Sequence, residues 1–393
     1  MIKDKKSNLT DQDNYRPIAM TCMSSKILEL LILNRYKDLL ISNHNQFGFK
    51  EKHGTDMCVF TLQQIIEYYH SFNSPVYMCF LDALKAFDKI NHWNLLAKLI
   101  KRHIPLIIIR LLYVWHSSQS FIVQWGSCLS KPFKVKNGVR QGGILSPFLF
   151  NLYLDDLSVA LNDSKVGCMI NAVYMNHLFY ADDSVLLAPS PSGLSKLMSI
   201  CQGYAASSEL SYNAKKTVIM CFKPKKLNRL KVPEFKLNGR NLKSVSSHKY
   251  LGVVLNCSSK HDDDIKREVR AIYTRGNILL KHFSSCTEDV KVKLFKTYCH
   301  GLYSSQLWCN FNKSTLKRLQ RAYNYVFRKL MQLDREESMS SKLVYYYVDG
   351  FKAMWQKLIC GFRIRIYRSN NLLIQTVINS ISFLSSKLNN VWI

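Results

Sequence analysis

The chain has 393 residues and carries 55 Lys+Arg against 27 Asp+Glu, a formal net charge of +28. Its hydrophobic content of 47% and aromatic content of 12% exclude a disordered chain and allow two or three domains. No apolar run reaches the roughly 18 residues of a membrane span, and the start "MIKDKKSN" lacks the apolar core of a signal peptide. We therefore expect an intracellular protein with no membrane partner.

The expected elements follow in chain order. Helical spacing marks "SSKILELLILNRYKDLL" and "DMCVFTLQQIIEYYHSF", and "PVYMCFLDA" is a short strand that ends on an acid. Two helices, "NLLAKLIKRH" and "PLIIIRLLYVWHSS", precede a predicted strand pair, "SFIVQWG" and "KPFKVKNGV". Then come the helix "SPFLFNLYLDDLSVALN", the strand–turn–strand "HLFYADDSVLLAP", the helix "PSGLSKLMSICQGYAASSEL" and the strands "KKTVIMCF" and "HKYLGVVLN". Beyond about residue 262 the pattern is mostly helical, so we predict an α+β first half and a helical second half.

The positive charge is concentrated in the second half. Residues 215–393 hold 34 basic and 11 acidic residues, whereas residues 1–214 hold 21 and 16. Aromatic residues interleave the basic ones, as in "KRLQRAYNYVFRKL". Such a surface attracts a polyanion, and nucleic acid is the expected one. The alternative is a basic helical domain without such a partner. The twelve cysteines form no CxxC pair, and we expect buried, reduced thiols.

Three acid runs need an explanation. Asp155–Asp156 lies inside a predicted helix, where acids are most simply solvated surface. Asp262–Asp264 opens a helix, where acids cap free N–H groups and favour the helix dipole. Both runs are thus explained without chemistry.

The third run, Asp182 and Asp183 in "FYADDSVLLA", has strand patterns on both sides. A two-residue turn would place both carboxylates at a hairpin tip, pointing the same way. Their repulsion is relieved by a divalent cation, and Mg²⁺ prefers carboxylate oxygens. Asp82, at the end of "CFLDALKAFD", is a third candidate ligand. The alternative is a surface loop.

Seven motifs, in order, resemble the reverse transcriptases of non-long-terminal-repeat (LINE-type) retrotransposons, most of all the jockey and chicken-repeat groups. Two are similar to fingers motifs: "NYRPIAMTCMSSKILELLILNR" and "NQFGFKEKHGT". "FLDALKAFDKINH" resembles motif A, "NGVRQGGILSPFLFNLYLDDL" motif B and "FYADD" motif C. "LSYNAKKTVIM" resembles motif D, and "HKYLGVVLN" the primer-grip hairpin. The matches cover about residues 10–330.

The resemblance implies a right-hand polymerase. Residues 1–75 would be mainly fingers, and 76–255 the palm with an antiparallel sheet and an interleaved fingers segment at about 105–140. Residues 256–393 would form a helical, basic thumb and a C-terminal extension. Asp82, Asp182 and Asp183 would hold two Mg²⁺ ions, with Mn²⁺ as a possible substitute. One ion would lower the pKa of the primer 3′-OH, and the other would bind the triphosphate.

The resemblance also implies roles around the nucleotide. Phe87 stands where the family has its steric gate against a ribose 2′-OH; as an alternative it is a core residue. Gln141 would sit beside the incoming nucleotide, and Gly142, like Gly143, would allow close backbone approach. Arg140 would touch template or phosphate.

Three basic residues complete the predicted site. Lys216 would protonate the leaving pyrophosphate, or else be a solvated lysine. Arg16 and Lys50 would contact the triphosphate from the fingers. The family commonly has Arg at the position of Lys50, so the bidentate fork is lost here.

The predicted function is an RNA-directed DNA polymerase that extends a DNA primer on an RNA template with dNTPs. The chain begins almost at the first fingers motif, so we expect a truncated element, or a fragment of a longer polyprotein, that lacks an endonuclease. An active enzyme would work in the nucleus, and an inactive protein would be cytoplasmic. A mobile-intron reverse transcriptase would usually carry a maturase region, and an RNA-dependent RNA polymerase prefers a small residue at the gate. The remaining alternative is an inactive, nucleic-acid-binding remnant.

Overall fold

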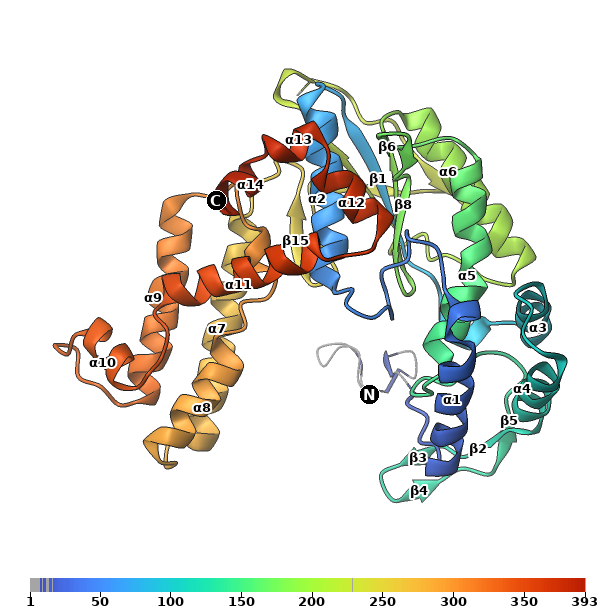
Figure 1. The fold of residues 1–393 in the computed structure, drawn as a ribbon, viewed down its shortest axis with the longest axis horizontal. Coiled ribbons are helices and arrows are strands. Elements are labelled where there is room, and N and C mark those ends of the chain that lie inside the picture. Colours follow the sequence, from blue (N-terminus) through green and yellow to red (C-terminus); the bar gives the residue numbers. More distant parts are fainter. Residues whose placement is uncertain (1–7, 9, 12–13, 16, 228, 393) are drawn as a thin grey trace.

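The protein is described by a computed structural model that covers residues 8, 10–11, 14–15, 17–227 and 229–392 (Figure 1). It combines one central sheet, flanked by helices on both faces, with a helical region in the second half of the chain. The predicted α+β first half and helical second half are therefore confirmed. The residue limits that we predicted for fingers, palm and thumb stay predictions.

The first half contains helices on either side of short strands. Its α-helices are α1 (Met23–Tyr36), α2 (Thr55–Ser71), α3 (His92–Lys101), α4 (Leu106–Ser118), α5 (Ser146–Asp163) and α6 (Pro191–Ser207). Its 3₁₀ helices are η2 (Lys37–Leu40), η3 (Ala86–Lys89) and η4 (Lys225–Leu227). Outside the central sheet, its paired strands are β2 (Ser120–Phe121) with β5 (Phe133–Lys134), β3 (Gln124–Trp125) with β4 (Cys128–Leu129), β6 (Met169–Ile170) with β7 (Val173–Tyr174), β11 (Lys236–Leu237) with β12 (Arg240–Asn241), and β14 (Ser247–Tyr250) with β15 (Val253–Asn256).

The central sheet has the strand order β13-β10-β1-β9-β8. Its strands are β1 (Val76–Leu81), β8 (His177–Tyr180), β9 (Asp183–Ala188), β10 (Val218–Phe222) and β13 (Lys243–Ser244). All neighbours are antiparallel except β10 and β13. The middle strand β1 is buried along its whole length, which explains its unbroken apolar sequence.

Alternate residues of the sheet belong to two separate cores. Tyr77 and Cys79 face a core that α5 and α6 complete, whereas Met78 and Phe80 face a core that α2 completes. Figure 1 shows these helices on opposite sides of the sheet. Because side chains alternate along a strand, both faces of β1 must be covered, and the helices on either side do so.

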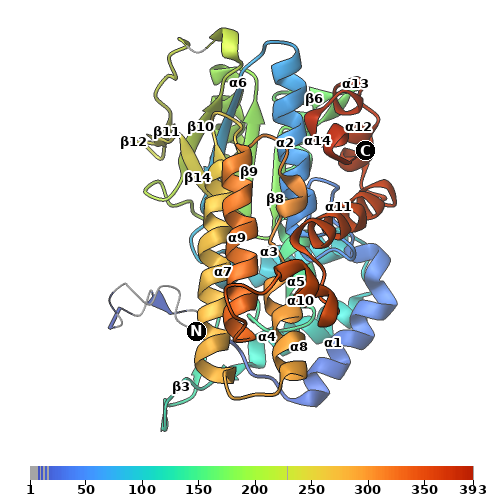
Figure 2. The ribbon, with the colours of Figure 1, turned by 90° about the vertical axis from the view of Figure 1, so that its left-hand side faces the viewer.

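The second half has its own helical core. Its helices are α7 (Asp262–Phe283), α8 (Glu288–Cys299), η5 (Ser305–Leu307), α9 (Lys313–Leu330), α10 (Met339–Tyr345), α11 (Phe351–Tyr367), α12 (Leu372–Ile378), α13 (Ile381–Leu384) and α14 (Lys387–Trp392). Helices α7 and α9 lie side by side (Figure 2) and share apolar residues that include Ile272, Tyr323 and Phe327. From α9 the chain returns along α11 to α2, where Phe362 and Phe383 pack against Phe60.

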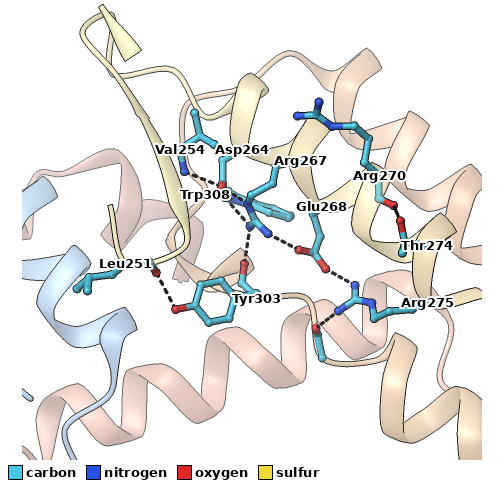
Figure 3. Close-up of polar contacts among 11 residues, drawn as sticks. Leu251, Val254, Asp264, Arg267, Glu268, Arg270, Thr274, Arg275, Tyr303 and Trp308 are labelled. Atoms are coloured by element: carbon cyan, nitrogen blue, oxygen red, sulfur yellow. Dashed lines mark hydrogen bonds and ion pairs between the residues drawn. The ribbon is translucent and has the colours of Figure 1, made fainter. Parts of the chain in front are cut away.

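A buried polar network joins the β14–β15 hairpin to α7 (Figure 3). Asp264, fully buried, accepts hydrogen bonds from the backbone N–H of Val254 (2.9 Å) and from Trp308 Nε1 (2.8 Å). Arg267 pairs with Asp264 and donates to the carbonyl of Tyr303. The Tyr303 hydroxyl in turn donates to the carbonyl of Leu251 at the hairpin tip (2.8 Å). The network fixes the hairpin relative to the helical region.

The prediction that Asp262–Asp264 serves to cap the helix is wrong in its main point. The acids do lie in the first turn of α7, where they suit the helix dipole as expected, but the N-cap residue is His261 and it makes no side-chain capping hydrogen bond. Asp264 forms an ion pair with Arg267. Asp262 accepts hydrogen bonds from Asn312 N (3.0 Å) and the Thr315 hydroxyl (2.6 Å). These acids are tertiary anchors.

The other helical acid pair also differs from expectation. Asp156 is exposed and pairs with Lys98, as a surface acid would. Asp155 is buried, pairs with Arg102 and accepts a hydrogen bond from Asn43 N (2.6 Å). The prediction of solvated surface is therefore wrong for Asp155, which ties α5 to the segment after η2.

Two further expectations meet the structure here. Among the described residues, no helix has both the length and the apolar character needed to cross a membrane. The cysteines are free, but only half of them are buried, and Cys22, Cys128 and Cys360 are exposed. The prediction of buried thiols is therefore confirmed only in part.

The Asp264 anchor makes a stability prediction. We expect Asp264→Ala to lower the free energy of unfolding by about 3 kcal/mol, because it removes one of the two carboxylates that pair with the half-buried Arg267 and the acceptor of Val254 N and Trp308 Nε1. Asp263→Ala, one residue earlier on the same turn, removes a surface pair with Lys266 and one side-chain hydrogen bond from Asn256, and is expected to lower the free energy of unfolding by about 1 kcal/mol. Urea denaturation of both variants measures the difference. Equal losses would contradict the anchoring role.

Candidate active site

Two of the predicted aspartates face each other across neighbouring strands. In the register of β1 and β9, Leu81 is opposite Ser184. Continuing that antiparallel register by one residue places Asp82 opposite Asp183. Both side chains reach solvent to some degree, although the strands that lead to them are buried. Strand pairing therefore brings together two acids that are 101 positions apart in the chain.

The turn beside them differs from the predicted one. The two-residue loop between β8 and β9 is Ala181–Asp182, and Asp183 is already the first residue of β9, paired with Tyr180. Ala181 has a φ of 57°, in the left-handed region. The expectation that Asp182 and Asp183 share the tip is therefore wrong for Asp183.

A cavity of about 190 Å³ opens at this point. It is lined by Phe80, Leu81, Asp82, Asp183, Ser184, Lys216, His248, Lys249, Tyr250 and Leu251. Motif A, motif C, motif D and the β14–β15 hairpin thus contribute to one cavity, as the resemblance implied. Asp182 is not among the lining residues and adjoins the cavity from the turn.

Lys216 is held at the cavity by the backbone of Asp82. The carbonyl of Asp82 accepts a hydrogen bond from Asn213 N (2.8 Å), and its N–H donates to the Thr217 hydroxyl (3.3 Å). The loop between these two bonds carries Lys216, whose side chain is exposed. Lys216 is thereby placed at the same cavity as Asp82 and Asp183.

The donor set suits a hard cation. Among the described residues, no three His, Cys, Asp or Glu side chains stand together as a ready metal cage. Mg²⁺ is commonly held by one or two carboxylates, with substrate phosphates and waters as its other ligands. Asp82 and Asp183 in one cavity meet that requirement, and Asp182 lies next to them in the chain.

Phe87 lies between two other rings. It stacks on Phe150 of α5, with ring centroids 4.1 Å apart and an interplanar angle of 5°, and meets Phe49 edge to face at 6.2 Å. It is partly buried. The ring is thus both part of the packing and held rigidly, so the two readings of Phe87 are compatible.

The motif B loop is held close to the N-terminal segment. Gly142 has a φ of 113°, and a Cβ there would lie 2.9 Å from the carbonyl oxygen of Ala19. The carbonyl of Gln141 accepts a hydrogen bond from Ala19 N, and its side chain donates to Asp88 (3.0 Å). The close backbone approach at Gly142 is therefore real, but its partner in the structure is this chain itself.

Arg140 has a partner inside the protein. It pairs with Glu29 of α1 (2.6 Å), donates to the Ser25 hydroxyl (3.2 Å) and lies over the ring of Trp115. Glu29 is buried and also accepts from the backbone N–H of Leu145 at the start of α5. The Arg140 guanidinium therefore holds the motif B loop against α1, and its expected contact with template or phosphate stays a prediction.

Glu29 was not predicted as a functional residue. It lies in an apolar helical pattern where a single acid carries no recognisable signal. Lys249, an exposed residue of β14 that lines the cavity, was also not predicted, although a lysine two residues before a predicted grip turn is a usable signal.

The two fingers cations have different outcomes. The Lys50 ammonium donates to the carbonyls of Ser42 (2.8 Å) and Asn43 (2.5 Å). Burial lowers the pKa of Lys50 to about 8. These partners show that Lys50 braces its own loop, and its triphosphate contact stays a prediction. Arg16 lies outside the described residues.

The chain is similar to several known proteins. The probable RNA-directed DNA polymerase from transposon BS of Drosophila melanogaster is 28% identical over 340 residues, which cover 81% of this chain and 36% of that protein. The RNA-directed DNA polymerase from mobile element jockey of Drosophila funebris is 28% identical over 338 residues, with the same two coverages. A solved structure of telomerase from Candida tropicalis in complex with a TWJ fragment of telomeric RNA aligns with 94% of this chain and 56% of its own, at 13% identity and a TM-score of 0.46.

These relatives confirm the resemblance to jockey-type elements. The chain spans 36% of the length of the two curated relatives, so the absence of an endonuclease stays a prediction. A family model described as reverse transcriptase (RNA-dependent DNA polymerase) matches residues 2–255, which include Asp82, Asp182, Asp183 and Lys216. The chain therefore belongs to the reverse transcriptase family.

Proposed function

We propose that this chain is an RNA-directed DNA polymerase that extends a DNA primer on an RNA template with dNTPs. The observation that carries the proposal is the cavity in which Asp82, Asp183 and Lys216 meet. Two carboxylates facing each other repel, and a divalent cation with a bound triphosphate removes that cost. The family membership supplies the reaction class.

The residues at and beside the cavity would have different roles in the reaction. Asp82 and Asp183, with Asp182 from the adjoining turn, would hold Mg²⁺, or Mn²⁺ in its place. Two bound ions would supply Lewis-acid activation of the primer 3′-OH and neutralise the triphosphate. Lys216 would donate a proton to the leaving pyrophosphate. Gln141, at the edge of the motif B loop, would contact the incoming nucleotide.

Template and primer would lie along the helical region. Most of the net charge resides there, and α9 presents Lys317, Arg318 and Arg321 beside exposed aromatic residues such as Tyr325. Phosphate contacts of this kind hold a duplex without reading its sequence. An active enzyme that uses a genomic DNA primer would work in the nucleus.

Primer extension tests the proposal. On poly(rA)/oligo(dT) with dTTP and Mg²⁺, we expect the wild type to synthesise DNA. Asp183→Asn keeps the side-chain shape but removes a metal-binding charge, so we expect synthesis to fall by about 100-fold or more. Asp163→Asn, at the exposed end of α5, is the matched control and is expected to retain synthesis.

The controls separate the two surviving interpretations. Synthesis that persists unchanged in Asp183→Asn would refute the assignment of the cavity. A folded wild type that binds the duplex but makes no DNA would refute the enzyme and support a nucleic-acid-binding remnant.

Phe87 predicts sugar selectivity. We expect Phe87→Val to reduce the preference for dTTP over UTP, in kcat/KM, by about 10- to 100-fold, because the smaller side chain leaves room for a ribose 2′-OH. Phe235→Val removes a similar buried ring from the core and is expected to leave the preference unchanged. Single-nucleotide extension measures both. An unchanged preference in Phe87→Val would leave Phe87 with its packing role alone.

A further inference from the structure

The segment before Gly48 forms an additional contact along β8. Gln46 and Phe179 form a parallel bridge. Phe47 N donates to the carbonyl of Phe179, and Phe179 N donates to the carbonyl of Asn45, both at 2.8 Å. The Asn45 side-chain amide also donates to the carbonyl of His177 (2.8 Å). This short segment therefore lies against the strand that leads into the aspartate turn.

Gln46 reaches from that segment to the turn itself. Its Oε1 accepts hydrogen bonds from Gly48 N (2.8 Å) and from Ala181 N (3.0 Å), and its Nε2 lies 3.4 Å from the carbonyl oxygen of Ala181, to which it donates. The side chain is 2% exposed. One buried amide thus serves both backbone groups of a turn residue that no strand pairs.

Ala181 is a residue that needs such support. Its φ of 57° is unfavourable for any residue with a Cβ. Its buried N–H and C=O groups would also be costly without partners. The chain uses neither Gly nor Asn here, so the hydrogen bonds from Gln46 hold the backbone in place of an intrinsic preference.

The backbone of the segment lies very close to the backbone of the turn. A Cβ on Gly48 would lie 2.4 Å from Ala181 N, and its φ is not in the left-handed region, so contact rather than conformation requires the glycine. The Asn151 side chain of α5 donates to the carbonyl of Gly48 (2.8 Å) and so attaches the segment to α5. The segment is therefore held on one side by the turn and on the other by α5.

We infer that Gln46 is the positioning residue for the carboxylates of Asp182 and Asp183. It touches neither substrate nor metal; it acts through Ala181, which directly precedes the pair. The inference rests on the proposed function. Removal of a group that orients a metal ligand without contacting the metal commonly lowers metal affinity or activity by about 10- to 100-fold.

The test uses Gln46→Met, which has a similar length but neither accepts nor donates strongly. Mn²⁺ binding to the full chain with primer–template, followed by the EPR signal of free Mn²⁺, is expected to weaken by about 10-fold or more. The Mg²⁺ concentration for half-maximal synthesis should rise in parallel, while KM for primer–template stays unchanged. Gln64→Met, a buried glutamine of α2 with Glu67 as its partner, is the matched control and should bind Mn²⁺ as the wild type does.

A purely structural role gives a different result. A melting temperature lowered equally in Gln46→Met and Gln64→Met, with Mn²⁺ binding unchanged in both, would overturn the inference. Gly48→Ala displaces the same turn through the 2.4 Å contact and should weaken Mn²⁺ binding as well, so it replaces Gln46→Met should that variant not fold. Because Mn²⁺ binding is read without turnover, a wild type that makes no DNA would refute the proposed function and leave this test intact.

Discussion

Repulsion between carboxylates on paired strands is the constraint around which this molecule is organised. Asp82 and Asp183 face each other because β1 and β9 are locked in register by buried side chains on both faces of the sheet. Local preferences would separate the two charges. Packing of α2 on one face and of α5 and α6 on the other overcomes that tendency. The energy of the two cores thus maintains an electrostatic arrangement that would suit the proposed cation and triphosphate.

Three sets of polar contacts hold the elements that line or adjoin the cavity. Apolar packing alone would not specify the positions of these elements. The loop before β10 binds the backbone of Asp82, Gln46 holds the turn before Asp182, and Asp264 with Arg267 holds the β14–β15 hairpin. Each brace is buried or half-buried, where hydrogen bonds and ion pairs are directional and costly to break. The position of the site therefore depends mainly on buried and half-buried contacts, and flexible surface residues contribute little to it.

The sequence was informative where function follows from local order. The strand that ends on Asp82 and the helix "SPFLFNLYLDDLSVALN" were predictable, and so was the meeting of Asp82 with Asp183. The hairpin of residues 247–256 was predicted only from the family resemblance, because its local pattern indicated a single strand. Partners across long separations were not. Asp155 is 112 positions from Asn43, Arg140 is 111 from Glu29, and Asp264 is 44 from Trp308. Helical periodicity gives such residues a face but no partner, so buried acids were mistaken for surface or capping ones.

The return of the last helices to α2 has a consequence for how the chain is made. Phe362, Leu373, Ile374 and Phe383 complete the core on one face of a sheet whose first strand lies near residue 76. During synthesis from the N-terminus, that face stays partly open to water until nearly the whole chain has left the ribosome. Contacts of such long separation form late and slowly, and the waiting apolar surface is prone to aggregation. Yield in a cell should therefore depend on chaperones that shield nascent chains.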